Sequence, residues 1–205
     1  MKNKGYVFFM RHGQTDWNVK KLMQGRDEIP LNEAGIEQAT WAASSLKKAL
    51  DKSGIKFAKI ITSPLSRAYV TGKIIAEAVG CEDLSTDQRL IERDFGELSG
   101  KPYDFNSPFI TGNDDSIKGL ERVEDVYLRI AEFVKENAQN NECVLAISHG
   151  SATGVFSAGT KKAPGVDDSA RVLHNCHMVV FSYDGNDIFM EGYDISPENL
   201  DKLEL

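Results

Sequence analysis

The sequence predicts an α/β protein with a mostly parallel central sheet, and two short apolar runs carry this prediction. The runs are Tyr6–Met10 and Cys143–Ser148, and polar residues bound each of them. Such a run is typical of a parallel strand that helices cover on both faces. Each run leads into a His-Gly pair, His12-Gly13 in the first case and His149-Gly150 in the second. Because sites in open α/β sheets form beyond the carboxyl ends of the strands, we expect the two imidazoles to meet at one sheet edge.

Helices are predicted where apolar residues recur at spacings of three and four. Asn32 is expected to cap the first helix and Gly54 to end it. The second is expected to begin at Ser63-Pro64, with serine as the cap and proline at the first helical position. Two more are expected over 120–138 and 151–158. The apolar positions assigned to the core are Ile36, Ala39, Ala43, Leu46 and Leu50 in the first helix, Ile74, Ile75 and Val79 in the second, and Val123, Val126, Ile130, Phe133 and Val134 in the third.

The rest of the chain is interpreted as one further strand, a terminal antiparallel hairpin and three segments without a clear period. These are, in that order, 57–62, the pair 177–183 and 188–193, and the segments 86–100, 101–119 and 161–171. The segment 101–119 combines prolines, glycines, aromatics and acids, and we interpret it as a short cap inserted over the site.

Length and composition narrow the class of protein. A chain of 205 residues with 41% hydrophobic residues can bury a sizeable core in one domain. The chain carries 31 Asp and Glu against 24 Lys and Arg, a formal net charge of −7. Such a balance argues against nucleic acid or an anionic membrane as the main partner. A cluster of cations in this acidic chain would therefore serve one binding site and not a nucleic-acid or membrane surface.

Cysteine and histidine usage indicates neither a disulfide framework nor a metal site. Cys81, Cys143 and Cys176 are widely spaced and form no CxxC pair. His174 and His177 are assigned structural roles. No apolar run approaches the roughly 20 residues of a membrane span, so a soluble, cytoplasmic protein is expected.

Five blocks of residues follow one another along most of the chain. They are Arg11-His12-Gly13 with Thr15 and Asn18; Gly25, Pro30-Leu31, Gly35 and Gln38-Ala39; Ser63-Pro64-Leu65-Ser66-Arg67-Ala68; Leu90-Ile91-Glu92 with Phe95-Gly96 and Gly100; and Ser148-His149-Gly150. Together, in this order, they resemble the histidine phosphatase superfamily, also called the phosphoglycerate mutase-like family. Arg-His-Gly alone would be a weak signal, but five ordered blocks make the resemblance specific.

The resemblance implies a fold, a chemistry and a set of site residues. The implied fold is a three-layer α/β/α sandwich with a mostly parallel central sheet, in a single domain over 1–205 with a cap insertion at about 99–120. The implied enzyme is a metal-independent phosphatase that needs no cofactor and acts on a small phosphomonoester. The implied residues are His12 as nucleophile, Glu92 as proton donor, His149 as a further catalytic residue, and Arg11, Asn18, Arg67 and His149 as ligands of the substrate phosphate.

Taken singly, the candidate site residues also have ordinary structural interpretations. A lone histidine at a strand end is more often hydrogen-bonded structure than catalyst, which applies to His12. Arg67, in the first turn of its helix, would be an exposed or ion-paired side chain, and Glu92 would belong to a solvated acidic loop together with Asp94 and Glu97.

The residue types suit phosphoryl transfer because the transferring group spreads negative charge over its oxygens. Arg11 and Arg67 offer planar forks that match phosphate, and a protonated His149 would add a charge-assisted donor. The two arginines also favour neutral His12, whose lone pair can then attack. Glu92, once protonated, can give its proton to the leaving oxygen.

The same motifs occur in mutases, so a cofactor-dependent phosphoglycerate mutase is the nearest alternative. A mutase needs extra cations for a second phosphate. The cap region lacks an adjacent arginine pair, and Ser151 stands where the mutase pattern favours asparagine. We therefore favour the phosphatase. The cap cations are Lys101, Lys118 and Arg122, the opposing acids are Asp104, Asp114 and Asp115, and the aromatics expected to contact the leaving group are Tyr103, Phe105 and Phe109.

Further alternatives stay open. Lys161, Lys162 and Arg171 could supply the cations that a mutase needs. A non-catalytic phosphate-binding or protein-interaction module is the alternative from another class, although His12 and Glu92 are both present. Among phosphatases, the substrate could be one metabolite, such as the nucleotide-loop phosphate of cobalamin synthesis, or protein phosphohistidine.

Overall fold

The computed structural model describes residues 4–104, 112–139, 141–166 and 173–203, and its centre is a seven-stranded sheet. The strand order is β3-β2-β4-β1-β6-β7-β5, and β6 runs antiparallel to both of its neighbours while the other pairs are parallel. The predicted α/β class with a mostly parallel sheet is confirmed. The strands are β1 (Gly5–Arg11), β2 (Phe57–Thr62), β3 (Leu84–Thr86), β4 (Cys143–Ser148), β5 (Lys161–Lys162), β6 (Met178–Tyr183) and β7 (Ile188–Ile195).

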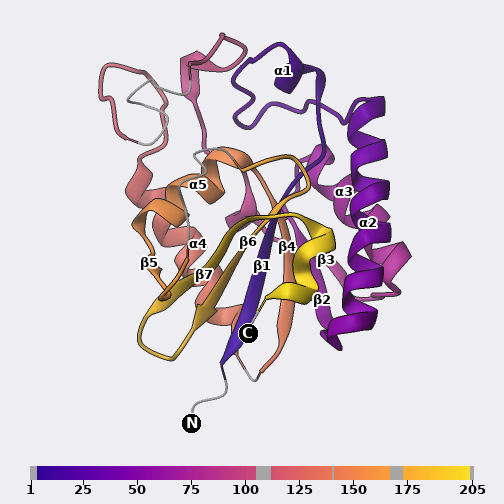
Figure 1. The fold of residues 1–205 in the computed structure, drawn as a ribbon. Coiled ribbons are helices and arrows are strands. Elements are labelled where there is room, and N and C mark those ends of the chain that lie inside the picture. Colours follow the sequence, from indigo (N-terminus) through magenta and orange to yellow (C-terminus); the bar gives the residue numbers. More distant parts are fainter. Residues whose placement is uncertain (1–3, 105–111, 140, 167–172, 204–205) are drawn as a thin grey trace.

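Helices cover both faces of the sheet (Figure 1), with α2 and α3 on one side and α4 and α5 on the other. A 3-10 helix near the C-terminus, η4, packs beside α2 through Leu200. The helices are α1 (Asp16–Val19), α2 (Glu33–Ser53), α3 (Ser66–Val79), α4 (Val123–Asn137) and α5 (Gly150–Gly159), and the 3-10 helices are η1 (Gln88–Leu90), η2 (Gly96–Leu98) and η4 (Pro197–Lys202).

The central strand β1 divides the core into two halves because its successive side chains point to opposite faces. Val7 and Phe9 join the cluster under α4 and α5, whereas Phe8 and Met10 join the cluster under α2 and α3. All four are fully buried. Fully burying a side chain of this size stabilises the fold by about 1.5–3 kcal/mol, so β1 anchors both layers.

The register of β1 against β4 places the two histidines at the same end of the sheet. β1 and β4 are parallel neighbours, and Arg11 pairs with Ser148 at their carboxyl ends. The pairing continues one step beyond the strand, where the His12 amide donates to the Ser148 carbonyl at 3.1 Å. His12 and His149, each following its strand directly, therefore leave the sheet side by side.

The predicted first helix is confirmed by its caps. The Asn32 side chain accepts a hydrogen bond from the Gly35 amide at 2.8 Å, and Gly54 ends the helix in the left-handed region at φ 74°. Ile36 was wrongly assigned to the core, since 47% of it is exposed. It lies in the first turn of α2, at the end of the helix that projects past the sheet.

The predicted start of α3 is wrong. The helix begins at Ser66, and Leu65 occupies the cap position without a side-chain hydrogen bond. The Ser63 hydroxyl is engaged elsewhere: it accepts from the Leu65 amide at 3.3 Å and contacts the ring Nε2 of His149 at 2.7 Å. The serine that resembles a helix cap thus belongs to the end of β2 and to the site beyond it.

Several short elements were not predicted, among them the 3-10 helices, α1, β3 and β5. Thr15 and Asn18 form a reciprocal capping box around the single turn of α1. β3 and β5 are edge strands of three and two residues inside or beside segments interpreted as irregular. Elements this short carry too few residues for a period to be visible in the sequence.

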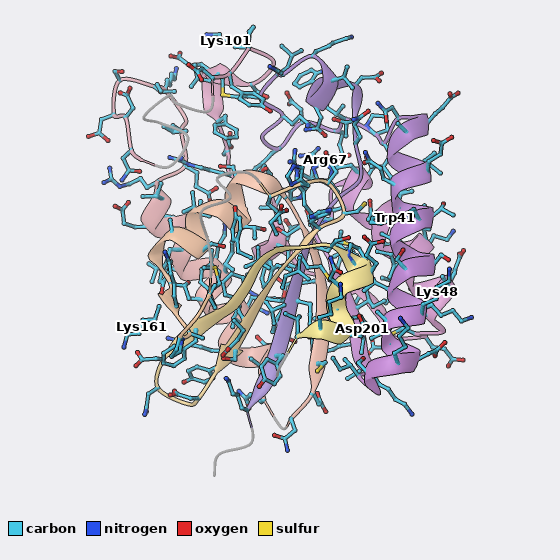
Figure 2. The ribbon with its side chains drawn as sticks, in the orientation of Figure 1. Trp41, Lys48, Arg67, Lys101, Lys161 and Asp201 are labelled. Atoms are coloured by element: carbon cyan, nitrogen blue, oxygen red, sulfur yellow. The ribbon has the colours of Figure 1, made fainter. Side chains whose placement is uncertain are left out.

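The described part of the predicted cap runs beside the loop that follows α1. The Gly100 amide donates to the Met23 carbonyl, and the Tyr103 amide donates to the Lys21 carbonyl. Figure 2 shows Lys101 beyond the end of the sheet at which β1 finishes. Phe105, Phe109 and Arg171 lie outside the described residues. Within the described ranges, no helix is long and apolar enough to cross a membrane.

Phe9→Ala should destabilise the protein by about 3–5 kcal/mol, because the ring packs edge-on against Phe133 and Phe181 at 5.8 and 5.4 Å between centroids. Urea unfolding followed by circular dichroism measures the loss, and Phe9→Leu supplies a milder variant that retains the fold. The matched control is Ile36→Ala, which should change stability by less than about 0.5 kcal/mol. Equal losses at the two positions would contradict this division between core and surface.

Candidate active site

The predicted site residues come from separate parts of the chain and gather at the carboxyl ends of the parallel strands. Arg11 ends β1, His12 and His149 follow β1 and β4, and Arg67 lies in the first turn of α3. Figure 2 shows Arg67 at this end of the sheet. The two imidazole rings meet edge to face with centroids 5.1 Å apart, and both are buried. The expectation that the two His-Gly pairs converge is therefore confirmed.

The His12 ring is held in one orientation by its own backbone. Its Nδ1 lies 2.6 Å from the carbonyl oxygen of Gly13, so Nδ1 carries the proton and donates. The Gly13 amide in turn donates to the Thr71 hydroxyl at 3.1 Å. In this tautomer the lone pair is on Nε2. Burial, reinforced by the charges of Arg67 and Arg11, lowers the pKa of His12 well below its ordinary value, so the ring is neutral near pH 7.

Both arginines are tied down by backbone carbonyls. Arg67 donates from Nη1 to the Asp27 carbonyl at 2.7 Å and from Nη2 to the Gly25 carbonyl at 2.8 Å. Arg11 donates from Nη1 to the Leu173 carbonyl at 2.7 Å. The Nε of each arginine is buried and has no hydrogen-bond partner among the described residues. A buried donor left without an acceptor costs about 1–3 kcal/mol, and an oxyanion is the acceptor that suits two guanidinium groups.

Burial lowers the pKa of both arginines, and the nearby carboxylate of Glu92 offsets part of this effect. Both nevertheless remain charged, since a guanidinium keeps its proton in proteins. The sequence-based alternative of an exposed Arg67 is wrong, because the side chain is fully buried.

Glu92 is buried and sits against the start of α5. Its Oε1 accepts from the amides of Ala152 at 2.7 Å and Arg93 at 2.8 Å, and its Oε2 accepts from the amide of Ser151 at 3.2 Å. The first amides of a helix have no partner within it, and they attract a negative group. Glu92 is therefore fixed beside the helix that His149 begins, and it is not part of a solvated loop.

His149 contacts Ser63 through Nε2 at 2.7 Å, and its Nδ1 is buried without a partner in the described part of the chain. Burial, followed by the charge of Arg67, lowers its pKa well below the ordinary value. The ring is therefore neutral unless an anion binds beside it. The protonated His149 expected from the sequence needs that anion to compensate its charge.

Asn18 lies on α1, and its side-chain oxygen is already used. That oxygen accepts from the backbone amide and from the hydroxyl of Thr15, both at 3.1 Å. The amide nitrogen Nδ2 is the group that can still donate a hydrogen bond to a ligand. Its predicted contact with phosphate stays a prediction.

Sequence reasoning missed two residues that hold the site. Ser63 contacts His149, as described above, and Asn175 donates from Nδ2 to the His12 carbonyl at 2.7 Å. Ser63 lies inside a recognised block, but its sequence context favours a helix cap. Asn175 carried no signal, because it is 163 residues away from its partner.

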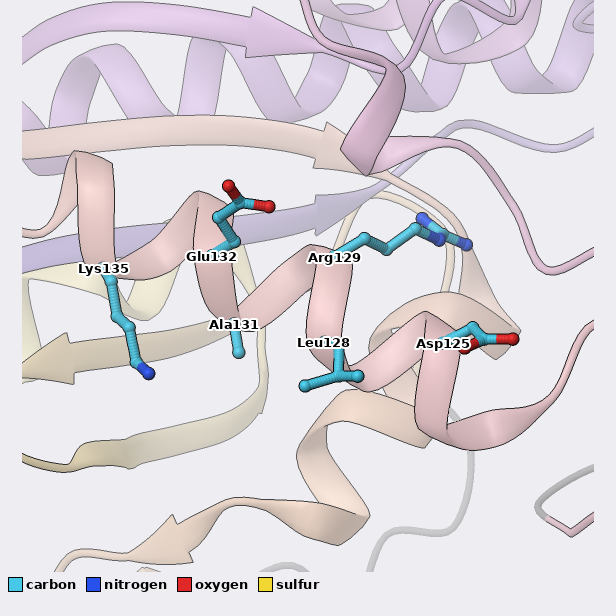
Figure 3. A pocket seen from close by; sticks show the side chains of 6 residues that line it. All are labelled: Asp125, Leu128, Arg129, Ala131, Glu132 and Lys135. Atoms are coloured by element: carbon cyan, nitrogen blue, oxygen red, sulfur yellow. The ribbon is translucent and has the colours of Figure 1, made fainter.

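A hollow lies on the outer face of α4 (Figure 3). Its lining contains none of the predicted site residues. The guanidinium of Arg129, which borders it, is engaged by the carboxylate of Glu121 and the carbonyl of Arg89. This hollow therefore offers no chemistry of the kind found at the sheet edge. The lining residues are Asp125, Leu128, Arg129, Ala131, Glu132 and Lys135.

Comparisons with known proteins agree with the resemblance seen in the sequence. The family described as "Histidine phosphatase superfamily (branch 1)" matches residues 7–195. The chain therefore belongs to the histidine phosphatase superfamily.

Related sequences carry mutase names, whereas a solved neighbour carries a phosphatase name. A 2,3-bisphosphoglycerate-dependent phosphoglycerate mutase of Rhizobium etli is 46% identical over 98 residues, which are 47% of this chain and 44% of that protein. The match thus spans less than half the length of this relative. An Enterobacter protein named "Probable phosphoglycerate mutase GpmB" is 28% identical over 188 residues, 86% of this chain and 84% of its own. The native structure of a mycobacterial glucosyl-3-phosphoglycerate phosphatase aligns with a TM-score of 0.73 at 25% identity, covering 94% of this chain and 100% of that one.

The lowered pKa values of His12 and His149 give a testable pH dependence. Both rings should keep the nitrogen chemical shifts of neutral imidazole as the pH falls through about 6.5, the ordinary histidine pKa. Nitrogen-15 NMR titration measures this, with His12→Gln used for assignment. The unfolded chain binds protons on His12 and His149 more readily than the folded chain does. The contribution of the two histidines to the free energy of unfolding is therefore complete above about pH 6.5 and is lost as the pH falls toward their pKa values in the folded protein. Titration of both rings near pH 6.5 would contradict the described burial.

Proposed function

We propose that this protein is a metal-independent phosphomonoester hydrolase that forms a phosphohistidine on His12. The observation that carries the proposal is the orientation of His12. Its Nδ1 is committed to the Gly13 carbonyl, which leaves the Nε2 lone pair available beside two buried guanidinium groups. A neutral, oriented imidazole next to fixed positive charge is what nucleophilic attack on phosphorus requires.

In the first step, the Nε2 lone pair of His12 forms a bond to phosphorus as the bond from phosphorus to the leaving oxygen breaks. Glu92 gives its proton to that oxygen, so an alcohol departs. In the second step, Glu92 as carboxylate takes a proton from water, and the resulting hydroxide displaces His12 from phosphorus. The products are the alcohol and inorganic phosphate, and His12 and Glu92 return to their starting forms.

The charge that develops on the phosphoryl oxygens is met by groups already in place. The Nε atoms of Arg11 and Arg67 supply two buried cationic donors. His149 becomes protonated when the phosphate dianion binds, and Asn18 donates from Nδ2. Little reorganisation is needed, because carbonyls and the α1 cap already fix these side chains.

Glu92 is fixed by three backbone amides that favour its carboxylate form, which is the form that accepts a proton from water in the second step. Oε1 accepts two short amide bonds, whereas Oε2 accepts a single bond of 3.2 Å. The proton is therefore carried on Oε2, and Oε1 serves to fix the carboxyl group. An approaching phosphate dianion favours the protonated form of a nearby carboxyl.

The cap at about 99–120, within a single domain over 1–205, would cover the leaving group. Support comes from Tyr103, whose pKa is raised by burial and partly lowered again by the charge of Arg11. The Tyr103 hydroxyl and the Arg11 guanidinium thus interact electrostatically. A leaving group with aromatic or apolar character suits this side of the site.

The mutase remains the alternative, because the named sequence relatives are mutases. A mutase would need free cations for a second phosphate. Two of the candidates are paired with acids: Arg122 with Asp115 at 3.1 Å, and Lys161 with Asp187 at 2.6 Å. These pairs are exposed and weak, but they weigh against a second phosphate site.

A screen of phosphomonoesters for inorganic phosphate release tests the function, run alongside 3-phosphoglycerate with and without 2,3-bisphosphoglycerate. We expect hydrolysis without the bisphosphate and no response to a chelator. His12→Ala should abolish turnover and the acid-labile phosphoenzyme while the circular dichroism spectrum is unchanged. Arg122→Ala is the control that should behave as the wild type in a phosphatase and lose activity in a mutase. Isomerisation without net phosphate release, or activity lost to chelator and restored by a divalent ion, would replace this proposal.

Glu92→Gln should separate a proton carrier from a structural carboxylate. Glutamine retains the size but has no transferable proton, so turnover of alkyl phosphates should fall by about 10²–10⁴-fold. With p-nitrophenyl phosphate, whose leaving group needs no proton, stopped-flow absorbance should show a burst of p-nitrophenol followed by slow turnover. Equal losses with both substrates, with no phosphohistidine accumulating, would leave Glu92 a structural role and shift the search to Asp94 and Glu97.

A further inference from the structure

Two histidines and one aspartate converge outside the proposed active site. His174 and His177 lie in the loop before β6, and Asp194 lies near the end of β7. The His174 Nδ1 is 2.7 Å from Asp194 Oδ2, and the His177 Nδ1 is 3.1 Å from Asp194 Oδ1. The two imidazole rings are 5.2 Å apart between centroids. Within the described ranges, these residues form the group of ligating side chains whose donor atoms all lie within 4.8 Å of one another.

The backbone holds Asp194 in place for this convergence. Its φ is 52°, in the left-handed region that L residues rarely adopt and that Asp tolerates better than most. From there its Oδ1 also accepts the amide of His174 at 2.9 Å. The carboxylate is largely covered, with 13% of the side chain exposed, whereas 65% of the His174 side chain is exposed. The cluster is therefore fixed at its buried aspartate and open to solvent at His174.

Two nitrogen donors and one carboxylate oxygen are a ligand set typical of zinc. Ligand atoms around a tetrahedral zinc ion are about 3.3 Å apart, given bonds of about 2.0 Å. The separations here are shorter, 2.7 Å to Oδ2 and 3.1 Å to Oδ1, and involve both carboxylate oxygens, so the side chains would have to rotate to admit an ion. With neutral histidines the cluster carries one negative charge, which attracts a cation. We propose that His174, His177 and Asp194 form a Zn²⁺ site, with a fourth position open to water.

The site would act on the segment that holds the reactive strand end. The Leu173 carbonyl accepts from the Arg11 side chain, and the His177 carbonyl accepts from the Arg11 amide at 3.0 Å. Between them, Asn175 donates to the His12 carbonyl. A zinc ion on His174 and His177 would thus restrain the segment 173–177, which positions Arg11 and His12. The ion would take no part in the reaction, and the hydrogen bonds to Arg11 and His12 form without it, so a chelator should lower the stability of the protein and leave turnover unchanged.

Isothermal titration of the full chain with Zn²⁺ tests the proposal directly, without reference to activity. We expect one ion per chain. Asp194→Asn, which tolerates the same backbone conformation, and His174→Ala, which changes an exposed side chain, should each weaken binding by at least about 10-fold. The matched control is Asp187→Asn, because Asp187 lies in the turn of the same hairpin but pairs with Lys161. Its affinity should equal that of the wild type.

Thermal unfolding supplies a second measurement. Zinc at about 100 times the wild-type Kd should raise the Tm of the wild type and of Asp187→Asn by roughly 5–10 °C, and should raise the Tm of Asp194→Asn by at most about half as much. Absence of zinc binding to the wild type would overturn the proposal. So would binding of undiminished affinity in both Asp194→Asn and His174→Ala, since the ion would then be held by other groups.

Discussion

The parallel pairing of β1 with β4 is the constraint on which the rest of the site depends. Arg11 lies opposite Ser148, and the ladder ends with the His12 amide on the Ser148 carbonyl. A slip of one residue would move Phe9 from the layer of α4 and α5 to the layer of α2 and α3, because strand side chains alternate between faces. It would also separate His12 from His149. The packing of two helical layers therefore fixes the distance between the two imidazoles.

Close backbone contacts give this strand end its shape. A Cβ on Gly35 would lie 2.0 Å from the Gln14 carbonyl oxygen, and a Cβ on Gly13 would lie 2.4 Å from the Gly35 carbonyl oxygen. Both separations are far below van der Waals contact, so glycine at these positions allows the start of α2 to touch the segment after β1. A third glycine, Gly150, leaves room for the Arg11 side chain, since its Cβ would lie 3.2 Å from Arg11 Nε.

The site keeps its positive charge in a chain whose formal net charge is −7. Arg11 and Arg67 are bound by carbonyl oxygens, which orient a guanidinium without cancelling its charge. The carboxylate that influences both is Glu92, and its oxygens accept hydrogen bonds from backbone amides. The result is a buried region of fixed positive charge. Such an environment favours neutral histidines and an anionic ligand together.

The sequence by itself determined the elements whose signal is local. The apolar runs of β1 and β4 predicted strands, the spacing in α2 and its Asn32 cap predicted a helix, and the strand-end motifs predicted where the histidines meet. Only the tertiary structure decided contacts between distant residues. Ser63 resembles a helix cap but contacts His149, and Glu92 resembles a loop acid but lies on the amides of α5. Local patterns report the preference of a segment, whereas a hydrogen-bond partner 59 or 86 residues away is set by how the layers pack.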